Sequence, residues 1–228
     1  MLAFAEEARR AQLEAAEARA MALLDRIEAL GLIAPGRTER DVEQDILRLA
    51  ETEFGITKHW HKRIVRAGPN TLAIARDHPP IATILADDIV FLDLGPVVEA
   101  WEADVGRSYV LGDDPGKRRL VADLDRIFAA VQAHYQAHPD ITGAELYVEA
   151  VAQAKSAGWH FGGEIAGHLV AEFPHACLPG DKEHGRIGPN NPTRMRDPDG
   201  NGEQRHWILE IHLVAPDHSF GGFTERLL

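Results

Sequence analysis

Residues 93–104 read DLGPVVEAWEAD and place two aspartates eleven positions apart. Asp93 ends the apolar run DIVFL (88–92), and Asp104 begins the next strand-like run after a short connection. On its own, DIVFL is typical of a buried strand. A carboxylate at the end of a buried strand is costly unless it is paired with a cation or holds a metal ion. The other motifs of the chain indicate whether these aspartates pair with a cationic side chain or bind a metal ion.

Composition excludes some classes of partner. The chain has 228 residues, of which 36 are acidic and 24 basic, giving a net charge of −12. Nucleic-acid binding is not expected, because it favours a basic face, although acids that bind cations do not act as repulsive surface. The single cysteine, Cys177, excludes an intrachain disulfide. The sequence has neither a signal peptide nor a run of about 20 apolar residues, so we expect no membrane contact and a cytoplasmic location.

Helical periodicity is clear in four segments of the chain. Apolar residues recur at three- and four-residue steps over 4–30, and the sequence APGR then ends this helix. Thr38 with Asp41, and Thr142 with Glu145, resemble capping boxes and predict helices up to about residue 53 and over 143–157. The remaining helix is predicted over 117–137.

Strand-like segments fill the rest of the sequence and alternate with turn signals. A long loop rich in Gly, Pro, Asn and Asp occupies 179–203, and such loops often border a site. The order of elements predicts one α+β domain over residues 1–228, with helices packed on an antiparallel sheet. The predicted strands lie within 61–68, 87–95, 102–112, 162–175, 205–216 and 221–228.

One predicted strand carries ionisable groups on a single face. In HWILEIHL (206–213), the alternation of side chains places His206, Ile208, Glu210 and His212 together, and apolar residues on the opposite face. An ordinary half-exposed strand gives the same pattern. Other predicted strands also carry an ionisable residue among apolar ones, which favours a shared site. His168 lies in the apolar segment IAGHLVAEF, and Glu225 lies in the final strand.

Four carboxylates and one imidazole point to metal chemistry if they meet. Carboxylates that share a site repel one another unless cations are present. Carboxylates with an imidazole suit Mn, Fe, Co or Zn ions, and carboxylates can bridge two of them. Two ions about 3.5–4 Å apart can activate a shared water and polarise a substrate carbonyl.

Several segments resemble the pita-bread metallopeptidases, the superfamily of methionine aminopeptidase, aminopeptidase P, prolidase and creatinase. DLGPVVEAWEADVGRSYVLG (93–112) resembles the two-aspartate signature of that superfamily. GHLVAEFPH (167–175) resembles its Gly-His segment, which has a second histidine seven residues on. LEIHL (209–213) stands where the family has a Glu-Pro segment, and GGFTERLL (221–228) resembles its terminal glutamate strand. The resemblance spans residues 15–228.

The resemblance implies the pita-bread fold and a centre of two divalent ions. We expect manganese first, with cobalt, zinc or iron as alternatives. By the family pattern Asp93 chelates one ion, Asp104 and Glu225 bridge both, and His168 and Glu210 complete the other. A bridging water would be the nucleophile. Glu210 would help to deprotonate it, and His175 would bind the substrate or stabilise the oxyanion.

Three features depart from the family pattern. His212 stands in place of the usual proline and is either a substrate contact or a plain strand residue. His78 precedes Asp93 by fifteen residues and is our candidate for the family's upstream, substrate-binding histidine, with His59 and His61 of HWH as the alternative source. Only a helix over 1–30 precedes the catalytic segments, so we expect no separate N-terminal domain.

The sequence is compatible with two functions. RAGPNT (66–71) favours the aminopeptidase P and prolidase branch, which predicts a dinuclear aminopeptidase or dipeptidase of Xaa-Pro type acting on short peptides. The alternative is a creatinase-like hydrolase or a lyase acting on a non-peptide small molecule. A homodimer is compatible with either. Trp60, Trp101 and Trp207 are candidates for the wall of a substrate pocket or for the core.

Overall fold

The helices begin and end where local sequence signals predict. The computed structural model describes residues 2–175 and 184–228. Both predicted capping boxes are formed: Thr38 Oγ1 accepts a hydrogen bond from the Asp41 backbone N–H at 3.1 Å, and Thr142 does the same for Glu145 at 3.2 Å. Such caps satisfy donors that the first turn leaves unpaired. The helices are α1 (Leu2–Ala29), α2 (Glu39–Phe54), α3 (Pro115–Ala137) and α4 (Gly143–Ser156).

The strands form an antiparallel sheet in which the C-terminal strand lies beside the strand that follows Asp104. Its order is β1-β2-β5-β9-β8-β6, with β7 paired to β8. The final strand β9 thus lies in the middle, between β5 and β8. The bounds are β1 (Ile64–Ala67), β2 (Ile89–Leu94), β5 (Val105–Val110), β6 (His160–Phe161), β7 (Gly167–Val170), β8 (His206–Val214) and β9 (Gly221–Leu227).

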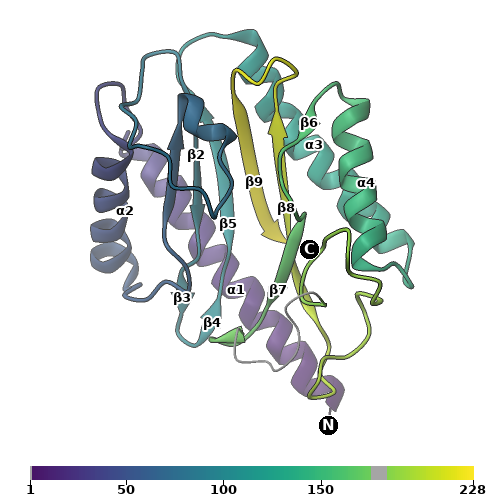
Figure 1. Ribbon diagram of the computed structural model, residues 1–228. Coiled ribbons are helices and arrows are strands. Elements are labelled where there is room, and N and C mark those ends of the chain that lie inside the picture. The colour runs from purple at the N-terminus through teal and green to yellow at the C-terminus, as the bar shows by residue number, and fades with distance from the viewer. Residues whose placement is uncertain (1, 176–183) are drawn as a thin grey trace.

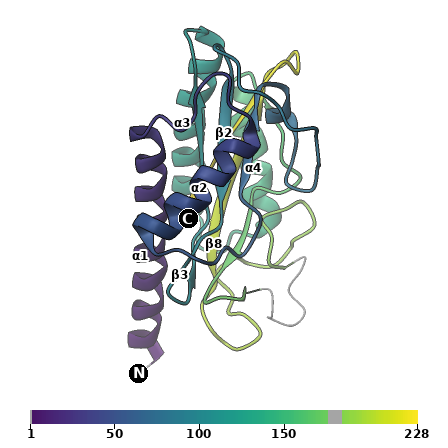
Figure 2. The same ribbon diagram turned by 90° about the vertical axis from the view of Figure 1, so that its left-hand side faces the viewer.

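Helices α1 and α3 pass behind the sheet in Figure 1, and the view turned by 90° in Figure 2 places them together on one side of it. Leu209, Ile211 and Leu213 of β8 are buried in one hydrophobic cluster with the apolar residues of α3 and α4. Val90, Leu92 and Leu94 of β2 are buried in a second cluster with α1 and α2. Because side chains alternate along a strand, the residues between these positions project from the opposite face.

The connection between the two aspartates is a small hairpin. Strands β3 (Val97–Val98) and β4 (Trp101–Glu102) pair with each other and turn the chain back from β2 into β5. Asp93 therefore lies near the end of β2, and Asp104 directly precedes β5. The predicted α+β class, with helices on an antiparallel sheet, is confirmed.

Some predicted strands are shorter in the structure. Of 162–175 only β7, Gly167–Val170, is a strand. The residues directly after β1 form a 3₁₀ helix, η1 (Gly68–Leu72). The described part of the predicted loop, 184–203, contains neither a helix nor a β-strand. Within residues 2–175 and 184–228, no helix has the length and apolar character needed to cross a membrane.

Candidate metal centre

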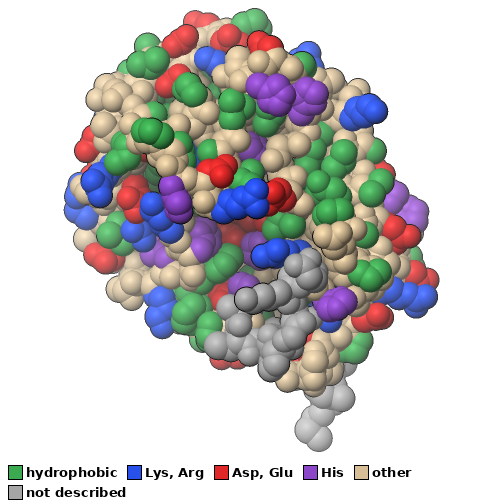
Figure 3. Space-filling view, in the orientation of Figure 1, with side chains coloured by type: hydrophobic (Ala, Val, Ile, Leu, Met, Phe, Trp, Pro, Cys, Tyr) green, Lys and Arg blue, Asp and Glu red, His purple; other side chains and the backbone are tan. Residues whose placement is uncertain are grey.

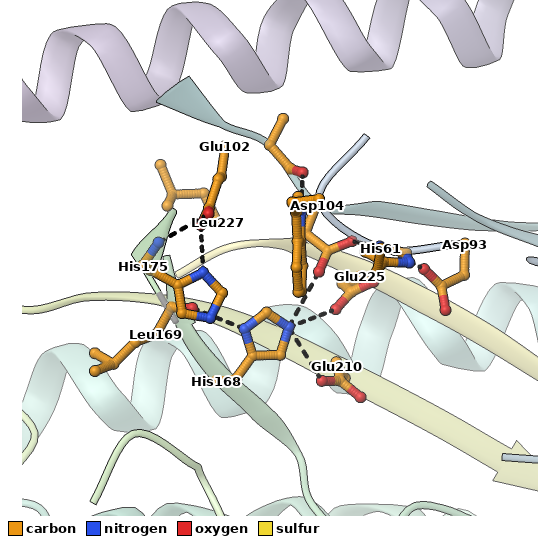
Figure 4. A network of polar contacts seen from close by, with 12 residues as sticks. His61, Asp93, Glu102, Asp104, His168, Leu169, His175, Glu210, Glu225 and Leu227 are labelled. Carbon is orange, nitrogen blue, oxygen red and sulfur yellow. Dashed lines mark hydrogen bonds and ion pairs between the residues drawn. The ribbon is translucent and has the colours of Figure 1, made fainter. Parts of the chain in front are cut away.

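Three carboxylates lie in one transverse row across four neighbouring strands. The strand register pairs Asp93 with Gly106, Gly106 with Glu225, and Glu225 with Glu210. Paired positions project from the same face of a sheet, so these carboxylates converge. Asp104 lies two residues before Gly106 and joins the same face. Figure 4 shows the four carboxylates with His168, which β7 contributes from the far side of β8.

A glycine in the middle of the row keeps the centre open. A Cβ atom on Gly106 would lie 2.5 Å from Cε1 of Phe223 and 3.0 Å from Cβ of Glu225. Carbon atoms in contact normally stay about 3.5–4.0 Å apart. The side chain missing at this position therefore leaves the space into which Asp93, Asp104 and Glu225 project.

Asp104 is the centre of the cluster. Its Oδ2 lies 3.0 Å from Nε2 of His168, and its Oδ1 lies 3.1 Å from Nε2 of His61. The His168 Nε2 atom is also 3.6 Å from Glu225 Oε1 and 3.7 Å from Glu210 Oε1. Among residues 2–175 and 184–228, two groups have metal-ligand spacing, and they share Asp104. One is His61, Asp93 and Asp104, and the other is Asp104, His168 and Glu225.

Burial and mutual repulsion shift the carboxylate pKa values. Burial raises the pKa of Asp93 to about 7 and that of Glu210 to about 7, with neighbouring carboxylates contributing to both. Burial and the charges of Asp104 and Glu210 hold the pKa of Glu225 well above its usual range. For Asp104, burial acts to raise the pKa, but hydrogen bonds from His168 and His61 outweigh burial and lower it.

The two histidines show the matching shifts. Burial acts to lower the pKa of His61, but the hydrogen bond to Asp104 and the charge of Asp93 outweigh burial and raise it to about 9. The pKa of His168 is raised well above its usual value, since its contacts with Asp104, Glu225 and Glu210 outweigh burial. Protonated imidazoles thus balance part of the negative charge in the metal-free protein.

The donor set fits divalent metal ions. Asp104 and Glu225 are each only 2% exposed, and buried charges of one sign are strongly unfavourable without cations. Oxygen and imidazole nitrogen together suit Mn, Fe, Co and Zn. Asp104 belongs to both groups of potential ligands, so the two groups form one continuous cluster.

These shifts predict that the metal-free protein loses stability as the pH rises from about 5 to 9. Asp93 and Glu210 have raised folded-state pKa values, so their contribution is complete below the unfolded value of about 4 and is lost as the pH rises through about 7. His61 contributes fully below its unfolded value of about 6.5 and loses this contribution through about 9. The lowered pKa of Asp104 has the opposite effect on stability, because its contribution is lost as the pH falls below the unfolded value of about 4.

Urea unfolding of chelator-treated protein at several pH values measures this effect. Added Mn²⁺ should reverse the trend, since bound cations favour the ionised carboxylates. A metal-free protein that is more stable at about pH 8.5 than at about pH 5.5 would contradict the electrostatic description of the centre.

His175 lies beside the cluster rather than in it. Its ring is nearly parallel to that of His168, with centroids 6.0 Å apart, and Figure 4 shows the two rings side by side. The Nδ1 atom contacts the carboxylate of Glu102, which is only 1% exposed, and the His175 backbone N–H donates to the same carboxylate at 3.0 Å. Glu102 therefore fixes the ring and leaves Nε2 as its second nitrogen for another partner.

A cavity of about 490 Å³ opens over the cluster. Figure 3 shows the corresponding hollow, with acidic atoms at its base and Lys and Arg side chains beside it. Apolar walls come from Phe91, Phe223 and Ile165, and Trp60 also lines the cavity. Trp207 is buried in the core, and Trp101 packs against two hydrophobic clusters.

The four residues predicted to share a face of β8 divide into two pairs. Glu210 and His212 line the cavity. His206 bonds to Glu6 of α1 through Nε2 at 2.6 Å, and Ile208 is buried with Leu13 of the same helix. The His212 Nε2 atom donates to the backbone oxygen of Thr71 at 2.8 Å, and burial lowers the His212 pKa, so this ring is neutral.

The structure does not bring His78 to the other predicted site residues. His78 is exposed on the loop after η1 and is absent from the residues that line the cavity. His61, the alternative in HWH, is the upstream histidine that reaches Asp93 and Asp104. Of these upstream histidines, His61 and not His78 therefore lies at the cluster, and a substrate contact of His78 stays a prediction. Cys177 lies outside the described residues.

A family model, metallopeptidase family M24, matches residues 8–196 of the chain. The chain is similar to the Xaa-Pro dipeptidase of Lactobacillus helveticus, with 30% identity over 151 residues that cover 62% of this chain and 39% of that protein. A second relative, the Xaa-Pro dipeptidase of Lactobacillus delbrueckii subsp. lactis, is 30% identical over 146 residues, which cover 61% of this chain and 39% of that protein. The chain thus spans about two fifths of the length of the curated relatives it matches.

Solved structures share the fold over almost the whole chain. An X-Pro aminopeptidase from Thermotoga maritima superimposes with a TM-score of 0.70 at 18% identity, covering 96% of this chain and 57% of that chain. A methionine aminopeptidase from the same organism gives a TM-score of 0.67 at 18% identity, covering 93% and 88%. The predicted pita-bread fold is confirmed.

Proposed function

Because the chain belongs to metallopeptidase family M24, we propose that it hydrolyses short peptides of Xaa-Pro type with two divalent metal ions. The observation that carries this proposal is the pair of ligand groups that share Asp104 at the base of one cavity. The Xaa-Pro preference rests on the activity for which the two curated relatives are named.

The ions would be held by five side chains: Asp93, Asp104, His168, Glu210 and Glu225. When bound, two such ions supply an activated water and polarise the substrate carbonyl. Manganese is the first metal to test, because oxygen ligands dominate the set and carboxylates suit this ion.

Glu210 is the proposed proton carrier. Its side chain lines the cavity, and its Oε1 atom lies 3.7 Å from Nε2 of His168. A pKa raised to about 7 in the metal-free centre means that this carboxyl group can hold a proton there. We propose that the carboxylate takes a proton from the attacking water and delivers it to the leaving amine, as a general base and then a general acid.

His175 is proposed to bind the reacting carbonyl. Its Nδ1 is oriented by the buried carboxylate of Glu102, and its ring lies against that of His168. A histidine held in one orientation can donate from its other nitrogen to a developing oxyanion without reorganisation. His212 is proposed as a substrate contact at the cavity wall.

The cavity chemistry supports a small peptide with an apolar residue. A volume of about 490 Å³ is within the range of small-molecule sites, roughly 300–1,000 Å³. Phe91 and Phe223 offer an apolar wall for a proline ring. Lys62 and Arg76 also line the cavity, and such cations suit the terminal carboxylate of a peptide.

A substrate panel tests the proposal. Protein reconstituted with Mn²⁺ should cleave Xaa-Pro dipeptides or longer peptides with proline in second position, and should cleave matched peptides with alanine in place of proline more slowly. Cleavage of non-peptide amides or amidines alone would favour the alternative of a creatinase-like hydrolase or lyase. Absence of any hydrolysis by protein that contains its full metal complement would overturn both assignments.

A further inference from the structure

We propose that His61 is a sixth ligand of the metal centre and supplies an imidazole to the ion held by Asp93 and Asp104. This inference rests on the proposed two-metal function. It gives each ion one imidazole: His61 on the Asp93 side and His168 on the Glu225 side. Asp104 lies between them and offers one oxygen to each histidine.

The two histidines are held in the same way. The Nδ1 atom of His61 is 2.7 Å from the backbone oxygen of Lys62, and that of His168 is 2.8 Å from the backbone oxygen of Leu169. A carbonyl oxygen only accepts hydrogen bonds, so Nδ1 carries the hydrogen in both rings. In the neutral ring Nε2 then presents a lone pair, which is the arrangement found in histidines that bind metals.

The spacing of the donor atoms also fits a shared ion. Ligands about 2.1 Å from one ion, at angles between octahedral and tetrahedral values, are about 3.0–3.4 Å apart. The Nε2 atom of His61 is 3.1 Å from Asp104 Oδ1 and 3.4 Å from Asp93 Oδ1. These values resemble the distances of His168 Nε2 to Asp104 Oδ2 and Glu225 Oε1, which are 3.0 and 3.6 Å.

The surroundings fix the ring of His61 in this position. A Cβ atom on Gly95 would lie 2.1 Å from Cδ2 of His61, so only a glycine there allows the ring to approach. Trp60 packs against the ring with centroids 4.4 Å apart. The Trp60 indole is itself anchored, because its Nε1 donates to the backbone oxygen of Ala103 at 3.0 Å. A ligand held before the ion arrives loses little entropy on binding.

A different role for His61 makes the opposite prediction. A permanently protonated His61 would be a cation that occupies the place of an ion beside Asp93 and Asp104. Its removal would then leave the carboxylates freer to bind metal, and metal affinity would rise. The ligand role predicts that affinity falls, so the sign of the change separates the two.

Calorimetric titration of metal-free protein with Co²⁺ provides the test. Wild-type protein should bind two ions, and His61→Ala should weaken one of the two sites by at least about tenfold, which is the loss seen even for residues that only support ligands. The matched control is His59→Ala, two residues away in the same segment and outside both ligand groups. His61→Gln, which keeps a polar side chain but lacks the imidazole, should weaken the same site.

Visible absorption of the Co²⁺ protein gives a second readout that does not depend on activity. Loss of a nitrogen ligand should change the Co²⁺ bands in His61→Ala and leave them unchanged in His59→Ala, with circular dichroism reporting the fold of each variant. Unchanged or tighter binding in both His61 variants, with unchanged bands, would overturn the ligand role while leaving the two-metal function intact. Wild-type protein that binds no metal would overturn both.

Discussion

Replacing Glu210 by glutamine is expected to lower turnover by about 10²–10⁴-fold, the usual loss when a general base is removed. Glutamine keeps the shape of the side chain but can neither accept a proton nor offer a negative charge. Glu210 pairs with Glu225 across β8 and β9 in the middle of the sheet, where the backbone ladder is continuous. The variant should therefore fold like the wild-type protein.

Rates at saturating metal, with metal content measured on the same samples, check this prediction. Glu51→Gln is the matched control, because Glu51 is exposed on α2 and does not line the cavity. A variant that keeps near-normal turnover with full metal content would show that Glu210 does not carry the proton. A variant that loses metal and activity together would assign Glu210 to binding alone.

Replacing Asp104 by asparagine is expected to remove both ions and all measurable activity. Asp104 is the one residue common to the two ligand groups, and its two oxygens contact different histidines. An amide has no charge and only one oxygen, so one group loses its oxygen from residue 104 and the other keeps only a neutral, weaker donor. Asp93→Asn is the informative comparison, since Asp93 belongs to one group only and this variant should keep one ion.

Thermal unfolding with and without metal reports the difference. Ligand binding stabilises the native state by mass action, by about 2.7 kcal/mol at a ligand concentration 100 times the Kd. The wild-type protein should gain the largest stabilisation from Mn²⁺, Asp93→Asn less, and Asp104→Asn almost none. Equal stabilisation of the two variants would contradict the sharing of Asp104 between two ions.

Local signals account for what the sequence predicts well. The capping pairs Thr38–Asp41 and Thr142–Glu145 act over three residues, so the starts of α2 and α4 follow from the sequence alone. Alternation along β8 likewise predicts that Glu210 projects from the face opposite to that of Leu209 and Ile211. In the structure Glu210 lines the cavity, and the two apolar residues are in the core. The predicted ligand set rests on motif order and resemblance, and in the structure these five side chains lie close together.

The position of His61 beside Asp93 and Asp104 could not be predicted from the sequence alone. His78 is separated from Asp93 by a loop, and spacing along a loop does not say which way a side chain projects. His61 reaches Asp93 because it precedes β1, whose Ile64 pairs with Asp93 across the sheet. That register, together with the close approach of the ring to Gly95, depends on tertiary packing. In the sequence, the segment HWH (59–61) is the signal that points to His61.

Counting the bound metal shows whether this chain holds two divalent ions around a shared Asp104. Metal-free protein is loaded with Mn²⁺, freed of excess ion by gel filtration, and analysed by plasma mass spectrometry against an accurate protein concentration. We predict close to two manganese ions per chain, because two ligand groups meet at Asp104. A ratio of zero after loading with Mn²⁺, and equally with Co²⁺, Zn²⁺ or Fe²⁺, would contradict the account.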